Sequence, residues 1–177
     1  MLPGPYFNSA AQIQKPQKGE LSHAVFFKDL QKARELLQQG ADPNERSTIG
    51  IGAPPLMISI THFSGLEMVK LLLDCGADVN NVRDGGNTPL MQSVISCQTD
   101  VTPLLIQRGA VLDKKCKDGL TALNYAERDK RIEQVNILKR AAADIVAKAH
   151  RARAARDLDI LRARPKLQIR PRRPDGK

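Results

Sequence analysis

Apolar side chains recur at helical spacing in the middle of the chain, with polar residues between them. Leu66, Val69 and Leu72, together with the leucines at 71 and 73, cover one side of a helix. Gly76 follows the last of them. Glycine takes a left-handed conformation without steric penalty, and that conformation commonly ends a helix. The pattern therefore predicts a helix that ends at Gly76.

A turn and a second helix are predicted after this glycine. The sequence Asp-Gly-Gly-Asn at 84–87 is typical of a β-turn. Thr88 is placed to cap the next helix, because its hydroxyl can accept a hydrogen bond from a free backbone N–H. Pro89 suits the first helical position, where its missing N–H removes no helix hydrogen bond. The predicted unit is thus a helix, a left-handed stop, a β-turn and a capped helix.

The same unit recurs along the chain. Leu56, Leu90 and Leu123 are 34 and 33 residues apart, and Gly-Ala pairs begin at 40, 76 and 109. The turn and cap return at 117–123, Lys-Asp-Gly-Leu-Thr-Ala-Leu. A period near 33 with this content resembles the ankyrin repeat, a β-turn followed by two helices. The resemblance covers about residues 20–140 and implies an all-α ankyrin-repeat solenoid, in which each repeat buries its apolar face on its neighbour.

Composition divides the chain into four expected parts. Residues 1–19 are rich in Pro, Gly and Gln and are predicted to be a flexible arm. Residues 141–164 are rich in Ala and Arg, both good helix formers, and are predicted to form a basic helix. Pro165 ends that helix, and residues 165–177 are predicted to be a disordered basic tail. Between these lies the repeat domain at 20–140, with repeats at about 20–50, 51–83, 84–116 and 117–140.

Some repeats depart from regularity. Asn44 and Leu56 are 12 positions apart, whereas Asn80 and Leu90 are 10 apart, so the first finger (the turn segment that joins two repeats) is two residues longer. Its residues Ile49 and Ile51 either fold back onto the stack or form an exposed apolar contact. Pro103 fits its helix only if Thr99 or Asp100 is the cap, because proline is poorly tolerated deep inside a helix. The second repeat carries one extra residue, since Leu56 and Leu66 are 10 positions apart and Leu90 and Thr99 are 9 apart, which predicts either a local bulge or a longer inter-helix turn.

The sequence also departs from the family's Thr-Pro-Leu-His motif. Met57, Met91 and Asn124 stand where His is usual, and Ala122 replaces Pro. Loss of the hydrogen bonds of that His predicts a less stable array with the same fold. In the first repeat, Lys28, Lys32, Arg34 and Glu35 give the polar outer face that is typical of a terminal repeat.

The net charge of +9 is concentrated at the ends of the chain. Residues 141–177 hold eleven Lys/Arg and four Asp/Glu, whereas residues 20–140 hold fifteen of each sign. The excess of positive charge in the C-terminal segment predicts an anionic partner for it.

No catalytic, metal or cofactor site is predicted. The three cysteines form no CxxC pair and are interpreted as small buried thiols of a reducing compartment. The three histidines lack metal-ligand spacing, and neither a nucleophile elbow nor a phosphate loop is present. The chain is predicted not to be an enzyme.

The chain is expected to be a cytoplasmic monomer. Its N-terminus lacks the apolar segment of a secretory signal peptide. No apolar run reaches the ~18–20 residues of a membrane-spanning helix, so no transmembrane segment is predicted.

The resemblance implies a scaffold that binds an unidentified partner protein through its finger tips and the concave face of its inner helices. Solvated surface is the alternative interpretation for each residue, because hot spots are a minority even within real interfaces. The candidates carried over by position are Asp84, Asn87, Lys115 and Lys117 at the finger tips, and Ile95, Ser96, Arg128 and Asp129 on the concave face.

The basic C-terminal segment is a second candidate site, for a non-specific anionic partner such as nucleic acid or acidic lipid. A merely solvated tail is the alternative. Arg162, Arg170 and Arg172 also resemble the Arg-rich export signal of some translocated bacterial effectors. The candidate anion-binding residues are Arg151, Arg153, Arg156, Arg162, Arg164, Arg170, Arg172 and Arg173.

Overall fold

A computed structural model describes residues 16–47 and 52–163 of the chain, and these residues are helical with no strand. The prediction of an all-α fold is confirmed. The helices in this part of the chain are α1 (Glu20–Phe26), α2 (Leu30–Gln38), α3 (Pro55–Thr61), α4 (Leu66–Asp74), α5 (Pro89–Ile95), α6 (Val101–Gln107), α7 (Ala122–Arg128) and α8 (Ile132–Ala163).

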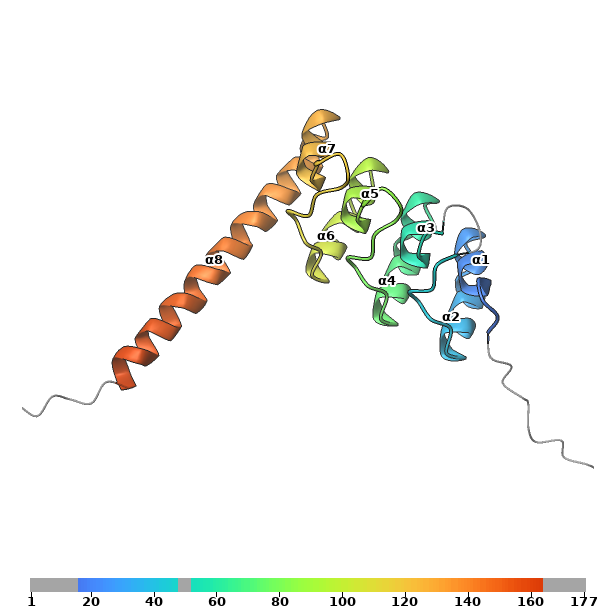
Figure 1. Ribbon diagram of the computed structural model, residues 1–177, viewed down its shortest axis with the longest axis horizontal. Coiled ribbons are helices and arrows are strands. Elements are labelled where there is room, and N and C mark those ends of the chain that lie inside the picture. The colour runs from blue at the N-terminus through green and yellow to red at the C-terminus, as the bar shows by residue number, and fades with distance from the viewer. Residues whose placement is uncertain (1–15, 48–51, 164–177) are drawn as a thin grey trace, which may run out of the picture. The chain divides into compact units, whose positions relative to one another are not determined.

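The repeats stack side by side. The inner helices α1, α3, α5 and α7 contact one another in that order, and α2, α4 and α6 form a second layer below them (Figure 1). One leucine per repeat, at the same position of each outer helix, lies in the core between the layers. These leucines, all at most 3% exposed, are Leu36, Leu72, Leu105 and Leu138.

The chain divides into two compact units, 1–140 and 141–177. The last helix, α8, supplies its residues up to Arg140 to the first unit and continues to Ala163. The glycines that end α2, α4 and α6 all have positive φ, between 88° and 90°. Ala142 stands at the corresponding position in α8, and the helix runs on as expected.

The local rules for helix ends are borne out. The Thr88 hydroxyl accepts from the Met91 N–H at 3.2 Å, and Pro89 is the first residue of α5. Gly76 follows α4 with φ +90°. The Asp100 side chain caps α6, which places Pro103 in its first turn. The fold of these repeats thus follows from sequence at the level of single caps and stops.

Asn124 replaces the missing histidine of the fourth repeat. Its side-chain oxygen accepts from the Thr121 N–H at 2.9 Å, and the Thr121 hydroxyl accepts from the Asn124 N–H at 3.2 Å. This reciprocal pair is a capping box. Asn124 thus supplies cap hydrogen bonds at the position where His is usual, and the predicted lower stability of the array stays a prediction.

The three fingers are closed by equivalent backbone hydrogen bonds. Cys116 donates to Leu120 and Arg83 donates to Asn87, each across four positions, whereas Ser47 donates to Ala53 across six. The first finger is therefore two residues longer, as predicted. Ile49 and Ile51 lie outside the described residues.

The extra residue of the second repeat lies between α3 and α4. In the first repeat Asp29 both donates its N–H to the Ala24 carbonyl and accepts from the Ala33 N–H. In the second repeat these roles fall to two residues, because Ser64 donates to Ser59 and Gly65 accepts from Val69. Of the two predicted alternatives, the longer inter-helix turn is confirmed.

Asparagines connect each repeat to the next. The Asn44 amide donates to the Gly76 carbonyl at 3.0 Å and accepts from the Asp78 N–H at 2.7 Å. Asn80, 36 residues on, bonds to Gly109 at 3.1 Å and to the Val111 N–H at 2.9 Å. A single amide thus satisfies one donor and one acceptor in the following repeat.

We expect Asn80→Ala to lower the free energy of unfolding by about 1–2 kcal/mol, because it removes two inter-repeat hydrogen bonds. Asp113, 33 residues on, holds the same position in the next repeat, and no side-chain hydrogen bond of Asp113 is found in the described part of the chain. Asp113→Ala is therefore the matched control, with little expected change. Urea unfolding followed by circular dichroism measures both, and equal losses would contradict the assignment.

Candidate functional site

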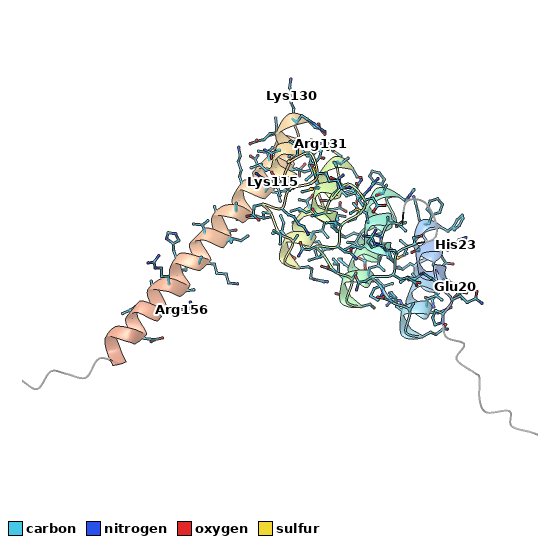
Figure 2. All side chains as sticks on the ribbon, in the orientation of Figure 1. Glu20, His23, Lys115, Lys130, Arg131 and Arg156 are labelled. Carbon is cyan, nitrogen blue, oxygen red and sulfur yellow. The ribbon has the colours of Figure 1, made fainter. Side chains whose placement is uncertain are left out.

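The eight candidate partner-binding residues lie in two rows at opposite ends of the inner helices. A seven-residue helix is about 10 Å long, so the two rows are separated by roughly that distance. Figure 2 shows Lys115 in a finger and Lys130 projecting from the end of α7. Asp84, Asn87, Lys115 and Lys117 precede α5 and α7, whereas Ile95, Ser96, Arg128 and Asp129 lie where those helices end.

The finger row has fixed spacing. The Arg46 guanidinium lies 3.4 Å from the Asp84 carboxylate and so joins the first two fingers. The Lys117 N–H donates to the Gly85 carbonyl at 3.0 Å, which joins the second and third. A Cβ on Gly86 would lie 3.3 Å from the Lys117 nitrogen, so only glycine fits this approach without a shift. The fingers therefore form one preformed edge.

Positive charge remains free on this edge. Lys115 and Lys117 are exposed, and neither has a carboxylate partner among the described residues. Asp84 is paired with Arg46, at a site where both side chains are mostly exposed. The third finger thus offers two unpaired ammonium groups to a partner.

The other row is built on a repeated helix end. Each inner helix is followed by a residue other than glycine in the left-handed conformation, with φ between 53° and 62°. These residues are Lys28, Phe63, Cys97 and Lys130. A polar side chain of the next repeat then donates to a carbonyl near the end of the helix. The donor–acceptor pairs are Ser64 to Val25 at 2.9 Å, Gln98 to Ile60, and Arg131 to Val94 at 2.6 Å.

Arg128 and Asp129 form an ion pair with each other. The Arg128 Nε donates to the Asp129 carboxylate at 2.9 Å, and the Arg131 guanidinium lies 3.4 Å from it. The hydrogen bond from Arg128 lowers the pKa of Asp129 and in turn raises the pKa of Arg128. Arg128 also stacks over the Tyr125 ring at 4.9 Å. This end of the row presents a neutralised pair instead of two free charges.

An aromatic cluster lies at the same edge in the first two repeats, among residues that the sequence analysis did not nominate. The His23 and Phe27 rings are 4.4 Å apart, and the Phe26 and His62 rings are 4.5 Å apart. Phe26 and Phe27 are 5.3 Å apart, which makes the contacts continuous. Phe63 follows His62. We call these five residues the aromatic patch. The signal that marks it is composition, because three of the four phenylalanines of the chain fall at these two helix ends.

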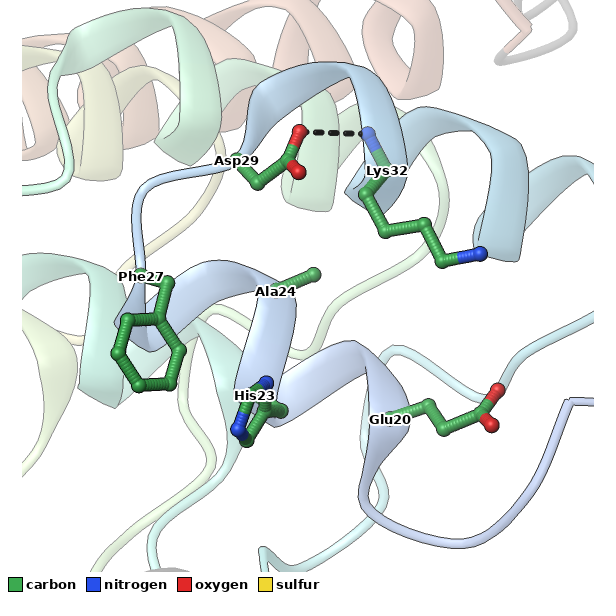
Figure 3. Close-up of a pocket in the computed structure, with 6 residues that line it drawn as sticks. All are labelled: Glu20, His23, Ala24, Phe27, Asp29 and Lys32. Carbon is green, nitrogen blue, oxygen red and sulfur yellow. Dashed lines mark hydrogen bonds between the residues drawn. The ribbon is translucent and has the colours of Figure 1, made fainter.

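The outer face of the first repeat carries an open groove lined by polar and apolar side chains, shown in Figure 3. The groove is lined by Glu20, His23, Ala24, Phe27, Asp29 and Lys32. In the second repeat, Ile58 occupies the position of His23 and Met68 that of Lys32, and they are 5% and 1% exposed. These two positions are thus apolar in the second repeat, where they face the first repeat, and polar in the first repeat. This arrangement confirms the polar outer face predicted for Lys32.

The basic residues of α8 point in different directions. Arg151, Arg153 and Arg156 are exposed. At 100° per residue Arg153 and Arg156 lie about 60° apart on one side of the helix, whereas Arg151 lies about 140–160° from both. The side chain of Arg162 and all of Arg164, Arg170, Arg172 and Arg173 lie outside the described residues.

The interpretation of the cysteines as buried thiols is wrong for two of the three. Cys75 and Cys97 are exposed, because they occupy the ends of α4 and α5. Cys116 is buried, and its sulfur lies 3.5 Å from the Tyr125 hydroxyl. That hydrogen bond, with burial, raises the pKa of Tyr125 to about 12, and it lowers the pKa of Cys116.

Among residues 16–47 and 52–163, no group of three His, Cys, Asp or Glu side chains is arranged to hold a metal ion. Within the same residues, every helix is too short or too polar to cross a membrane.

Comparison with known proteins places the likeness in the repeats. A family model described as ankyrin repeats (3 copies) matches residues 21–116 and 56–149. Neurogenic locus notch homolog protein 4 from Homo sapiens is 35% identical over 94 residues, 52% of this chain and 5% of that protein. E3 ubiquitin-protein ligase hecd-1 from Caenorhabditis elegans is 32% identical over 128 residues, 70% of this chain and 5% of that protein. Protein fem-1 homolog A from Bos taurus is 37% identical over 85 residues, 48% of this chain and 12% of that protein.

The chain thus spans only a small part of the curated relatives that it matches. An activity named for one of those proteins belongs to a sequence at least eight times longer than the shared segment, since the largest of these shares is 12%. The feature that these proteins share with this chain is the array of ankyrin repeats.

Proposed function

Because the chain belongs to the ankyrin-repeat family, whose repeats generally mediate protein–protein interaction, we propose that it is a non-catalytic scaffold that binds a partner protein. The binding surface comprises the finger tips and the ends of the inner helices. The observation that carries the proposal is the backbone bond between Lys117 and Gly85, which fixes the spacing of two fingers. A preformed surface loses little conformational entropy when it binds.

The charge of the third finger indicates what the partner presents to it. Lys115 and Lys117 are exposed and are separated by one residue, and Lys117 begins the turn of the finger. Carboxylates on a partner would pair with them at the rim of the interface, where charge affects association rate and specificity more than affinity. We infer an acidic surface opposite the third finger.

Reversal of these charges is expected to weaken partner binding about tenfold, equivalent to about 1.4 kcal/mol, without lowering thermal stability. Affinity capture with mass spectrometry on the full-length protein identifies the bound protein, and the dissociation constant is then measured with purified Lys115→Glu/Lys117→Glu. The matched control is Arg34→Glu/Arg140→Glu, two exposed cations outside both rows that, like the finger lysines, have no carboxylate partner among the described residues. Undiminished affinity in the finger variant, or equal loss in the control, would remove the fingers from the interface.

The alternative function is an anion-binding adaptor, in which residues 141–177 dock on nucleic acid or acidic lipid. The exposed Arg151, Arg153 and Arg156 favour it. Contact of these arginines with phosphates is favoured over deep insertion into a lipid surface, because α8 has few bulky apolar side chains with which to anchor. Deletion of 141–177 within the same capture experiment separates the two functions, because a scaffold retains its protein partner and an adaptor loses its ligand.

A further inference from the structure

Two exposed phenylalanines distinguish the aromatic patch from the rest of the inner-helix row. Phe27 is 63% exposed and Phe63 is 58% exposed. They occupy the helix-end positions at which the third and fourth repeats carry Ser96, Cys97, Asp129 and Lys130. The chain thus exposes large aromatic side chains at only one end of a row that is otherwise small or polar over the described residues.

The exposure of the Phe63 ring is unfavourable, and its backbone conformation adds a second cost. Its φ is +53°, a conformation that glycine and asparagine adopt easily and bulky residues rarely do. An exposed phenylalanine gains little from burial that could offset this strain. Strained residues that persist without a packing reward are concentrated at binding sites.

Two lysine ammonium groups near the aromatic patch have no carboxylate partner among the described residues. The carboxylates of this region are directed to other groups. Glu20 accepts from the Gln17 N–H and Asp29 from the Lys32 N–H at 2.9 Å, so both keep their negative charge, and Glu67 pairs with Lys70 at 2.8 Å. Lys28 and Lys32 are exposed, and in the part of the chain that the structure describes neither ammonium has a carboxylate within 4.0 Å. The patch therefore combines apolar rings with unpaired positive charge.

We propose that the aromatic patch binds an acidic segment of a partner protein. Apolar side chains of that segment cover Phe27 and Phe63, and its carboxylates pair with Lys28 and Lys32. Aromatic anchors inside a charged rim are the usual composition of an interface hot spot. The inference rests on the proposed scaffold function and adds a second contact surface, at the opposite end of the inner helices from the fingers.

A peptide library provides the probe. Random 12-residue peptides displayed on phage are selected on the full-length protein, and the dissociation constants of the selected peptides are measured by fluorescence polarisation. We expect selection of peptides with Asp or Glu beside apolar residues. Phe27→Ser/Phe63→Asn should weaken their binding at least about tenfold, and Lys28→Glu should weaken it severalfold. Selection of basic or uncharged peptides, or binding unaffected by both variants, overturns the proposal.

The third repeat supplies a matched control. Cys97 has the same left-handed backbone as Phe63, with φ +57°. Both Phe63→Asn and Cys97→Asn should raise the melting temperature by about 2 °C, but only Phe63→Asn should weaken peptide binding. A lower melting temperature for Phe63→Asn would show that Phe63 has a structural role and would overturn the proposal.

Two further outcomes keep this inference separate from the proposed function. Lys115→Glu/Lys117→Glu should leave peptide binding unchanged, since the finger row is distant from the patch. If that variant loses the captured protein while no acidic peptide binds the wild type, the scaffold function stands and the aromatic patch does not take part. Self-association of the wild type that Phe27→Ser/Phe63→Asn abolishes would identify the occupant as a second copy, and would likewise overturn the proposal.

Discussion

Met68→Lys should unfold most of the repeat array, with an expected loss of about 4 kcal/mol. Met68 is 1% exposed, and it lies where the second repeat packs on the first. A lysine there places an ammonium group between two apolar helix layers with no carboxylate to pair with it. The loss is a large part of the roughly 5–15 kcal/mol that stabilises a typical domain. Thermal unfolding followed by circular dichroism measures it.

The reciprocal substitution is the control. Lys32 holds the same position in the first repeat, where it lines the groove shown in Figure 3. Lys32→Met should leave the melting temperature almost unchanged, since no repeat packs on that face among the described residues. If Met68→Lys were tolerated as well as Lys32→Met, the two positions would not be equivalent, and the stacking register would be wrong.

Helix ends were predictable because they depend on residues a few positions apart. Thr88 caps α5, and Gly76 ends α4, through hydrogen bonds that span five residues or fewer. Such rules need only the local sequence and the steric freedom of glycine. The period near 33 then places the same caps in every repeat, and the fold class follows from it.

The contacts between repeats were not predictable in the same way. Gln98 and Arg131 bond to carbonyls 38 and 37 residues earlier in the chain. Their partners are set by the stacking register, and the same position carries serine in the second repeat. Side chains as different as Ser, Gln and Arg fulfil one role here, so residue type gives no signal.

The exposure of side chains at the ends of the inner helices could not be predicted from the sequence either. Phe27 belongs to an apolar run that predicts burial, yet it falls one residue beyond α1 and is exposed. Cys97 was expected to be buried, but it lies in the left-handed turn after α5. A shift of one residue in a helix boundary moves a side chain from the core to the surface. Candidate binding residues at these ends therefore depend on the part of the prediction that is least reliable.

Leu72→Ala should lower the free energy of unfolding by about 3 kcal/mol. Leu72 is fully buried, and it packs in an inner repeat that has a neighbour on each side. Removal of its side chain therefore leaves a cavity that neither neighbouring repeat can fill without a shift of its own helices. Urea unfolding provides the free energy. In a Tyr6→Phe background, which leaves one tyrosine, the fluorescence of Tyr125 reports the fourth repeat independently.

Leu36→Ala tests whether the array behaves as a stack or as one globular core. Leu36 holds the same position and is equally buried, at 1% exposed, but within the described residues its repeat has a neighbour on one side only. In a stack, energies sum over nearest-neighbour interfaces, so the terminal substitution should cost less than Leu72→Ala. It should also separate the unfolding of the first repeat from that of the Tyr125 region. Equal losses with coincident transitions would mean that all repeats share one cooperative core, and that the interface between neighbours is not the unit of stability.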